Sequence, residues 1–314
     1  GWREPRHSRR SSFTSALLVM RSMTASGRIC APARKFPLVR PSRALGVAPR
    51  ASQGRALEPG DLVLVAGATG GVGQLVTAKL LERGFSVRAL DRARTNRSRA
   101  AQLFPGAAVE VFPADLRDRS TMLGLTDGVA AVCCCTGTTA FPSSRWEGEN
   151  GPRNTDWVGT SNLIDSTSST IKRFVLVTSV GVERFTEFPF SILNLFGVLK
   201  YKRDSELHLQ SSGLSYTIIR PGRLTDGPYT SFDLNTLLQA TAGARQDVQL
   251  SARDDQRGEA SRIAVAEAVV QSLLLPSTCN RYYSICSTVG EGPGKDTAKW
   301  ETLFSSCDAT EAST

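Results

Sequence analysis

Apolar residues follow two alternating patterns along the chain after residue 60. The first is a short run of β-branched and aliphatic residues, which suits a strand buried on both faces of a sheet. Such runs occur at 62–65, 85–90, 108–112, 128–135, 172–178 and 215–219. The second pattern places apolar residues at helical intervals, and it occurs at 74–82, 156–166 and 201–209. Strands that alternate with helices predict an α/β fold, with a doubly wound and mostly parallel sheet and right-handed crossovers.

The alternation stops after Gly222. The elements predicted beyond this residue are an apolar helix at 261–275, a short strand at 281–286, a final helix at 297–304, and a lid or helical excursion at 229–240. Together they would form a small C-terminal subregion that faces a substrate and runs from about residue 221 to residue 310.

Positive charge is concentrated at the N-terminal end of the chain. Residues 1–55 hold 12 Lys and Arg residues and one acid, Glu4, whereas the whole chain has a net charge of +9. The remaining 26 basic and 28 acidic residues leave residues 56–314 with a net charge of −2. A basic face for nucleic acid is therefore not expected on the folded part of the chain.

Residues 1–56 are predicted to be a transit peptide or a disordered leader. They are rich in Arg, Ser, Ala and Pro and poor in aromatic residues, which is typical of an organellar targeting segment. The chloroplast, in the stroma or at the thylakoid surface, is the expected location. The mitochondrion and a basic arm that stays on the protein are the alternatives. One folded domain is then expected over 57–310, and no apolar run reaches the ~20 residues of a membrane helix, which leaves peripheral membrane contact open.

The sequence DLVLVAGATGGVG, from Asp61 to Gly73, joins an apolar run to a glycine-rich turn. Gly67, Gly70 and Gly73 have the spacing GxxGxxG, and helical periodicity follows directly. A strand, a glycine turn and a helix N-terminus together present main-chain N–H groups and the positive end of the helix dipole, which suits a pyrophosphate. An ordinary glycine-rich turn is the alternative interpretation. The predicted cofactor contacts here are Gly67, Thr69, Gly70, Gly71, Val72 and Gly73.

Two residues at the end of the second predicted strand bear on the choice of nucleotide. Asp91 lies 24 residues after Gly67, close to where an acid that binds the adenosine ribose hydroxyls is expected. Arg92 would instead bind a 2′-phosphate with its guanidinium. Arg94 and Arg97 add positive charge to the same loop, so NADP is the predicted cofactor and NAD is the alternative.

Cysteine and histidine offer little material for a metal site or a catalytic nucleophile. Cys133, Cys134 and Cys135 are adjacent within an apolar run, where they are expected to act as small buried hydrophobic residues. The chain contains two histidines, His7 and His208, which is too few for a histidine-rich metal site. No metal is predicted.

Five segments, taken in their order, resemble the atypical short-chain dehydrogenase/reductase family, and more narrowly its plastid-targeted NAD(P)-binding members from plants and algae. The resemblance covers about 62–304 and implies a Rossmann fold. The segments are VAGATGGVG from Val65, DLRD from Asp115, NLID from Asn162, RFVLVTSVGV from Arg173 and GLSYTIIRPGRLTDGP from Gly213.

The resemblance also implies roles for single positions beyond the glycine turn and Arg92. Asp115 and Leu116 would line the adenine, and Thr136 and Gly137 would lie in the loop that passes the cofactor. Ser179 would hydrogen-bond a substrate carbonyl.

The catalytic pattern of that family is incomplete in this chain. Lys202 matches the lysine that binds the nicotinamide ribose and lowers the pKa of a tyrosine acid four residues earlier, but that earlier position is Val198. A tyrosine of pKa about 10 donates a proton when a nearby cation stabilises its phenolate, whereas valine has no proton to donate. Tyr201 is adjacent to Lys202, and neighbouring helical residues do not face each other, so Tyr201 is a poor substitute.

Two functions from different classes remain open at this point. The first is an NADP-dependent oxidoreductase that acts on a small plastid metabolite, with Ser179, Lys202 and Tyr201 as catalytic candidates. The second is a non-catalytic NADPH-sensing scaffold or assembly factor, whose affinity for a protein partner differs between the nucleotide-bound and free states.

Overall fold

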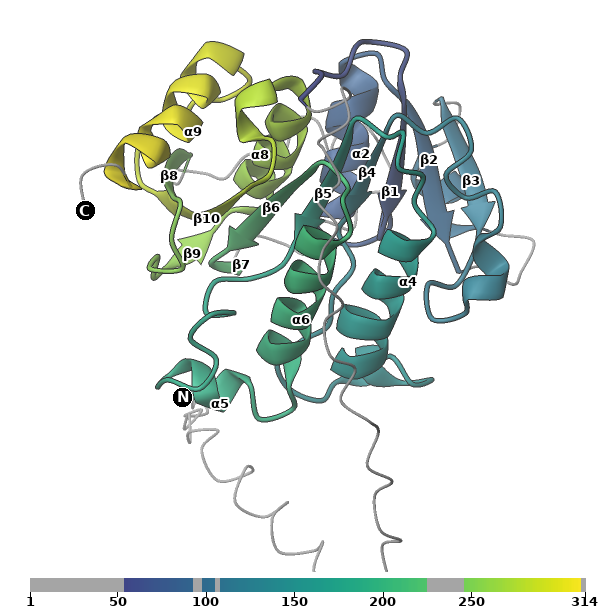
Figure 1. Cartoon of the computed structure of the whole chain (residues 1–314), viewed down its shortest axis with the longest axis horizontal. Helices are drawn as coiled ribbons and strands as arrows, with labels where there is room; N and C mark the ends of the chain where they lie inside the picture. Colours follow the sequence, from purple (N-terminus) through teal and green to yellow (C-terminus); the bar gives the residue numbers. More distant parts are fainter. Residues whose placement is uncertain (1–53, 93–97, 105–107, 225–245, 312–314) are drawn as a thin grey trace, which may run out of the picture. The chain divides into compact units, whose positions relative to one another are not determined.

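A computed structural model of the chain describes residues 54–92, 98–104, 108–224 and 246–311 (Figure 1). Nearly all of the predicted leader and the whole predicted lid at 229–240 lie outside these residues. Among the residues that the structure describes, no helix combines the length and the apolar character needed to cross a membrane.

Within the described residues, eight strands form the main sheet. In spatial order they are β3 (Val109–Pro113), β2 (Ser86–Asp91), β1 (Leu62–Ala66), β4 (Ala131–Cys134), β5 (Arg173–Val177), β6 (Tyr216–Pro221), β10 (Arg281–Thr288) and β8 (Asp247–Ser251). Neighbouring strands are parallel, except that β8 runs antiparallel to β10. The strand order reverses direction between β1 and β4, which is the doubly wound arrangement, so the predicted fold class is confirmed. A separate pair of short parallel strands consists of β7 (Arg223–Leu224) and β9 (Glu259–Ala260).

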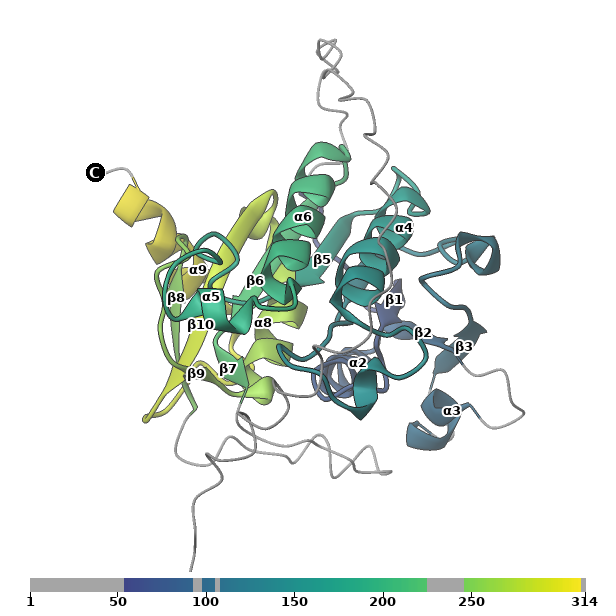
Figure 2. The same ribbon diagram turned by 90° about the horizontal axis from the view of Figure 1, so that it is seen from below.

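Helices cover both faces of the main sheet. Figure 2 shows α4 (Thr160–Asp165) and α6 (Val198–Ser211) on one face, with α2 (Gly73–Glu82) and α8 (Arg262–Leu274) on the other. The other helices of the described part of the chain are α3 (Arg99–Leu103), α5 (Phe190–Leu193) and α9 (Thr297–Glu311). The short 3₁₀ turns there are η1 (Arg119–Met122), η2 (Ser144–Trp146) and η4 (Pro276–Thr278), and η3 (Arg153–Gly159) is a π-helical segment.

The first strand shows how the hydrophobic pattern builds this layered core. Successive side chains of a strand point to opposite faces of a sheet. Val63 and Val65 therefore join the cluster that contains α2 and α8, whereas Leu64 and Ala66 join the cluster that contains α4 and α6. All four side chains are fully buried, because helices cover both faces.

The three adjacent cysteines fall at the end of β4. Cys133 and Cys134 are fully buried on opposite faces of the sheet, as expected for small hydrophobic residues. Burial raises the pKa of both thiols, so they stay protonated at neutral pH.

Several element boundaries differ from the predicted ones. The strand predicted at 128–135 begins at Ala131, because Gly128 has a positive φ of 71° and forms a turn. The helix predicted at 201–209 begins three residues earlier, after Gly197, and the helix predicted at 156–166 is π-helical in its first half. Strand β8 was not predicted, because its mixed sequence DVQLS has no clear apolar run and is held by pairing with β10.

Candidate functional site

A cavity of about 480 Å³ lies beyond the carboxyl ends of β1, β2, β3 and β4. The loops that follow these four strands contribute its walls, together with part of the segment between Asn150 and Gly159. Most of the residues predicted to contact a cofactor line it, namely Gly67, Thr69, Gly70, Gly71, Asp91, Arg92, Asp115, Leu116, Thr136 and Gly137. Val72, Gly73 and Lys202 are not part of the lining.

The glycine turn between β1 and α2 is closed tightly on itself. Gly67 has a φ of +82°, and a Cβ atom placed on it would lie 3.0 Å from the carbonyl group of Cys135. A Cβ atom on Gly73 would lie 2.0 Å from the carbonyl oxygen of Gly67, a distance that no side chain tolerates. The main-chain N–H of Gly70 donates to the same Gly67 oxygen at 2.8 Å. Residues with side chains at positions 67 and 73 would therefore force the turn open.

The start of α2 keeps the positive character of a helix N-terminus. Val72, which precedes the helix, forms no side-chain cap, and the first turn of α2 contains no acid. The first N–H groups of a helix lack partners within the helix. This end of α2 is therefore suited to a phosphate.

Three arginines, Arg92, Arg99 and Arg117, line the cavity, and we call this part its arginine end. Arg92 Nη1 donates to Asn150 Oδ1 at 2.5 Å. Asp91 also lines the cavity, but its Oδ2 accepts hydrogen bonds from Ser98 Oγ at 2.6 Å and from the backbone N–H of Ala100 at 3.1 Å. One oxygen of this carboxylate thus holds the start of α3.

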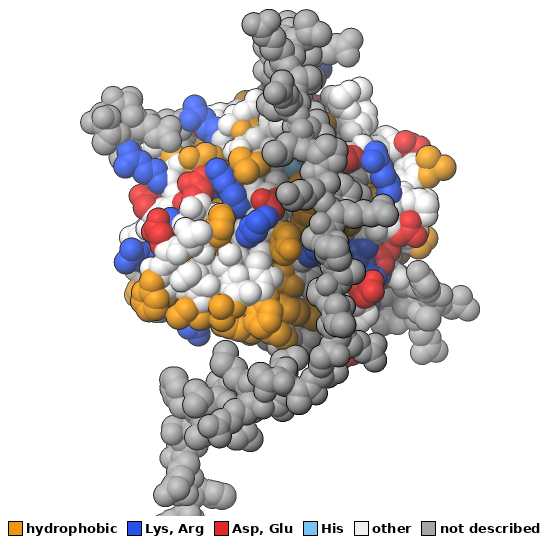
Figure 3. Space-filling view, turned by 60° about the horizontal axis from the view of Figure 1, so that its bottom comes forward, with side chains coloured by type: hydrophobic (Ala, Val, Ile, Leu, Met, Phe, Trp, Pro, Cys, Tyr) orange, Lys and Arg blue, Asp and Glu red, His pale blue; other side chains and the backbone are white. Residues whose placement is uncertain are grey.

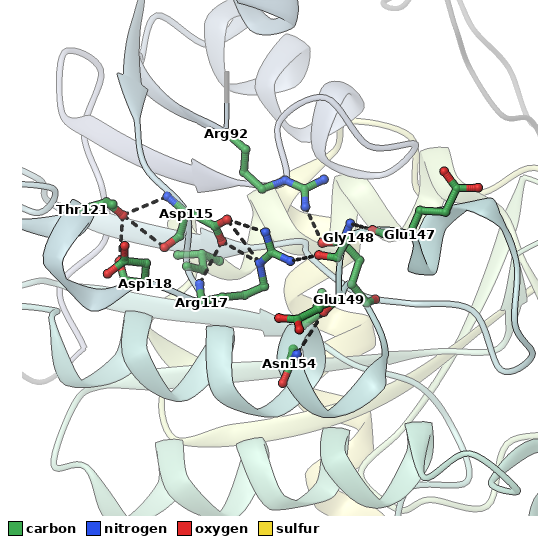
Figure 4. Close-up of polar contacts among 12 residues, drawn as sticks. Arg92, Asp115, Arg117, Asp118, Thr121, Glu147, Gly148, Glu149 and Asn154 are labelled. Atoms are coloured by element: carbon green, nitrogen blue, oxygen red, sulfur yellow. Dashed lines mark hydrogen bonds and ion pairs between the residues drawn. The ribbon is translucent and has the colours of Figure 1, made fainter. Parts of the chain in front are cut away.

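Asp115 and Arg117 form a bidentate ion pair at the arginine end (Figure 4). Arg117 Nε lies 2.9 Å from Asp115 Oδ1, and Arg117 Nη2 lies 2.6 Å from Asp115 Oδ2. Hydrogen bonding from Arg117 lowers the pKa of the Asp115 carboxyl below its ordinary value, although partial burial acts in the opposite direction. The remaining guanidinium nitrogen of Arg117, Nη1, donates to the carbonyl oxygen of Gly148.

Lys202 is buried and paired with Asp156. Its Nζ lies 2.6 Å from Asp156 Oδ1, and the side chain of Asp156 is 1% exposed. The other oxygen of Asp156 accepts a hydrogen bond from the hydroxyl of Thr138. A Cβ atom placed on Gly137 would lie 2.8 Å from Lys202 Nζ, so the ammonium group lies close to the loop that lines the cavity. The sequence did not predict a role for Asp156, because it is a single acid in η3 and its partner lies 46 residues away.

The other catalytic candidates, Ser179 and Tyr201, do not line the cavity. Ser179 follows β5, and its hydroxyl donates to the carbonyl oxygen of Val180 at 3.1 Å. Val198 is buried in a small apolar cluster with Val180 and Phe190. The ring of Tyr201 packs against Gly197, and neither Tyr201 nor Ser179 is among the lining residues.

The turn after Ser179 is fixed by a buried carboxylate from a distant loop. Asp254 Oδ1 accepts the backbone N–H of Gly181 at 2.7 Å, and Asp254 Oδ2 accepts that of Glu183 at 2.8 Å. Thr178, directly before Ser179, donates its hydroxyl to the fully buried Glu206 at 2.6 Å. These contacts hold the backbone on both sides of Ser179.

A glycine turn at a helix N-terminus, at the switch point of a doubly wound sheet, defines a dinucleotide-binding Rossmann protein. The chain belongs to the NAD(P)H-binding family, whose family model matches residues 67–276. The predicted resemblance to atypical short-chain dehydrogenases/reductases of the plastid type is confirmed by this match and by the relatives below.

Two relatives and one solved structure illustrate the similarity. Protein TIC 62 of Arabidopsis thaliana is 36% identical over 199 residues, which cover 58% of this chain and 30% of that protein. Sanguinarine reductase of Eschscholzia californica is 29% identical over 283 residues, which cover 77% of this chain and 94% of that protein. ChuY, an anaerobilin reductase from Escherichia coli O157:H7, shares the fold with a TM-score of 0.55 and 24% identity, over 71% of this chain and 96% of that one.

The chain therefore spans less than a third of the length of the Arabidopsis TIC 62 protein. The predicted chloroplast location is confirmed, because plant relatives of the chain, TIC 62 among them, are chloroplast proteins.

Proposed function

We propose that this protein binds NADP in the cavity and acts as an NADP-dependent oxidoreductase on a small plastid metabolite. The observation that carries the proposal is that one cavity joins the glycine turn to three arginines. A turn of this kind suits the pyrophosphate that NAD and NADP share, whereas clustered arginines suit a further phosphate.

The chain's own residues would hold the parts of the nucleotide as follows. N–H groups of the turn between Gly67 and Gly73 would bind the pyrophosphate, apart from that of Gly70, which already donates to the Gly67 carbonyl oxygen. Arg92 would bind the 2′-phosphate. Asp91 has one oxygen engaged by Ser98 and Ala100, which weakens its fit to ribose hydroxyls and supports NADP over NAD. Asp115 and Leu116 would line the adenine, and Thr136 and Gly137 would lie along the nicotinamide half.

The bound dinucleotide would supply or accept a hydride. Asp156 holds Lys202 next to Gly137, and we assign Lys202 the role of proton donor. Val198 replaces the tyrosine acid, and the ring of Tyr201 packs elsewhere. Ser179 would orient a carbonyl, because its backbone is fixed on both sides. Two proteins similar to this chain, sanguinarine reductase and ChuY, are reductases, which supports reduction as the direction of the reaction.

The test has two stages. Calorimetric titration with NADPH and NADH should give binding of both, with tighter binding of NADPH. NADPH oxidation is then followed by absorbance with a panel of carbonyl compounds and quinones, in the wild type and in Lys202→Met. Turnover that is lost in Lys202→Met supports the oxidoreductase; tight NADPH binding without turnover on any substrate contradicts it.

The second candidate function is a non-catalytic NADPH-sensing scaffold, and an exposed apolar surface favours it. Phe188, Ile192, Leu195 and Phe196 are 79%, 48%, 67% and 46% exposed around α5. This helix lies low in Figure 1, and Figure 3, which brings that side forward, shows hydrophobic side chains gathered there. An exposed patch of this kind is typical of a protein or membrane contact.

The same apolar surface touches a cavity-lining segment. Trp146 packs edge-to-face against Phe196, with ring centroids 5.4 Å apart, and Phe141 does so at 6.4 Å. The chain then continues from Trp146 to Asn150 at the arginine end. A scaffold in which nucleotide binding changes partner affinity would have a short route between the two sites.

A further inference from the structure

The segment 147–150 lies against the arginine end of the cavity (Figure 4). It is contacted by two arginines from different loops: Arg92 reaches Asn150 from the loop after β2, and Arg117 reaches the carbonyl oxygen of Gly148 from the loop after β3. The segment therefore fixes two of the three guanidinium groups at this end of the cavity, those of Arg92 and Arg117.

The side-chain amide of Asn150 is held in one orientation. Its Nδ2 donates to the carbonyl oxygen of Glu147. Its main-chain N–H donates to the carbonyl oxygen of Trp146 at 3.1 Å, and its main-chain carbonyl oxygen accepts a hydrogen bond from the Thr155 hydroxyl at 3.1 Å. Because Nδ2 already donates to a carbonyl, the oxygen Oδ1 must be the atom that faces Arg92. Asn150 thus presents a fixed acceptor to the guanidinium.

Arg92 and Arg117 carry the same positive charge, but only that of Arg117 is paired with a carboxylate within the described residues. Asp115 neutralises Arg117 in a bidentate ion pair, whereas Arg92 forms no ion pair with a carboxylate within the described residues and is exposed at the cavity. A guanidinium has five N–H donors, so the single bond to Asn150 leaves a pair of donors for a phosphate. A neutral acceptor orients Arg92 without cancelling its charge.

We infer that Asn150 is a positioning residue for Arg92 and thereby sets the preference for NADP over NAD. The inference rests on the proposed function and adds the residue that makes the 2′-phosphate site rigid before the nucleotide binds. Holding a long side chain in its bound geometry beforehand removes part of the ordering cost of binding. An acid at position 150 would hold Arg92 as firmly, but it would repel the phosphate.

The experiment compares the dissociation constants of NADPH and NADH for the full chain and for Asn150→Leu, Asn150→Asp and Asn154→Leu. We expect Asn150→Leu to weaken NADPH binding about fivefold, the order of the net contribution of one hydrogen bond, and to leave NADH binding unchanged. Asn150→Asp should weaken NADPH binding by about thirtyfold, because the new carboxylate would lie within several ångströms of the phosphate and repel it. Competition by 2′-AMP should fall in both variants, while competition by 5′-AMP should not.

Asn154→Leu is the matched control, because its Nδ2 donates to the Glu149 carbonyl at 3.1 Å in the same stretch of chain but contacts neither arginine. It should change both constants less than twofold. Equal losses of NADPH and NADH in Asn150→Leu, or no loss of NADPH, would overturn the inference and leave the proposed function standing. Absence of binding of both nucleotides to the wild type would overturn the proposed function itself, and the inference with it.

Discussion

The glycine turn and the first turns of α6 differ in how far their polar groups are already satisfied. At the glycine turn, the start of α2 has no side-chain cap and no acid, and Arg92 carries a charge that no described carboxylate pairs with. At α6, Lys202 is already paired with the buried Asp156, and Val198 lies in an apolar cluster.

This difference separates binding from turnover. The glycine turn offers donors and positive charge that gain partners when an anion binds. The α6 region has its charges matched within the protein, so a reaction there has to draw its proton from the Lys202 and Asp156 pair or from the substrate. Nucleotide binding is therefore encoded more directly than catalysis.

The largest expected effect is on the glycine turn. Gly73→Ala should weaken NADPH and NADH by more than about a hundredfold, because its Cβ would lie 2.0 Å from the Gly67 oxygen and the turn has to open. Gly151→Ala is the control, since the nearest atom to its Cβ would be 4.0 Å away. Calorimetric titration with circular dichroism on both variants checks this, and unchanged affinity in folded Gly73→Ala would contradict the pyrophosphate assignment.

The next effect is on the stability of the fold and concerns the ion pair at α6. Lys202→Met leaves the buried Asp156 carboxylate without its cation, so the free energy of unfolding should fall by about 3 kcal/mol. Lys200→Met is the matched control on the same helix: its partner Asp204 is at the surface, so the loss should be about 0.5 kcal/mol or less. Urea unfolding measures both losses, and equal losses would show that the buried pair contributes no more to stability than the surface pair.

Arg92→Ala distinguishes the two nucleotides. It should weaken NADPH binding by roughly tenfold to thirtyfold, which is the net contribution of hydrogen bonds to a charged group, and it should change NADH binding little. Arg119→Ala removes an arginine that is 59% exposed and pairs loosely with Asp165 at 3.7 Å, so it should leave both constants unchanged. Loss of NADH affinity as large as that of NADPH would refute the 2′-phosphate assignment.

The smallest effect concerns pH. Arg117 keeps the pKa of Asp115 below its ordinary value of about 3.9, so the ionised pair stabilises the fold above about pH 4 and that contribution is lost as the pH falls through the lowered pKa. The difference in unfolding free energy between wild type and Asp115→Asn should therefore shrink on acidification. Urea unfolding from about pH 6 to about pH 2 tests this, and a constant difference would contradict it.

The sequence predicted those parts of the molecule whose contacts are local. The strand, turn and helix between Leu62 and Glu82 are contiguous, so periodicity and glycine spacing were enough to place them. The sequence also showed that Val198 replaces the tyrosine acid, because the expected position is four residues before Lys202 on the same helix.

The contacts between segments that lie far apart in the sequence could not be predicted in the same way. Asn150 meets Arg92 across 58 residues, and Asp156 meets Lys202 across 46 residues. Each is a single polar residue with no periodic pattern, and its partner is chosen by how the loops pack. Asp91 is a further case, since its contacts with Ser98 and Ala100 depend on where α3 begins.

The contact between Trp146 and Phe196 has a consequence for measurement. The short chain segment that ends at Asn150 also carries Trp146, so a molecule that bound around α5 and displaced this tryptophan would be expected to shift the acceptor in front of Arg92. Thermodynamic linkage then requires reciprocity: the factor by which that molecule changes the dissociation constant of NADPH equals the factor by which NADPH changes the dissociation constant of that molecule. Nucleotide titrations with and without that molecule would thus reveal its binding at the opposite end of the segment.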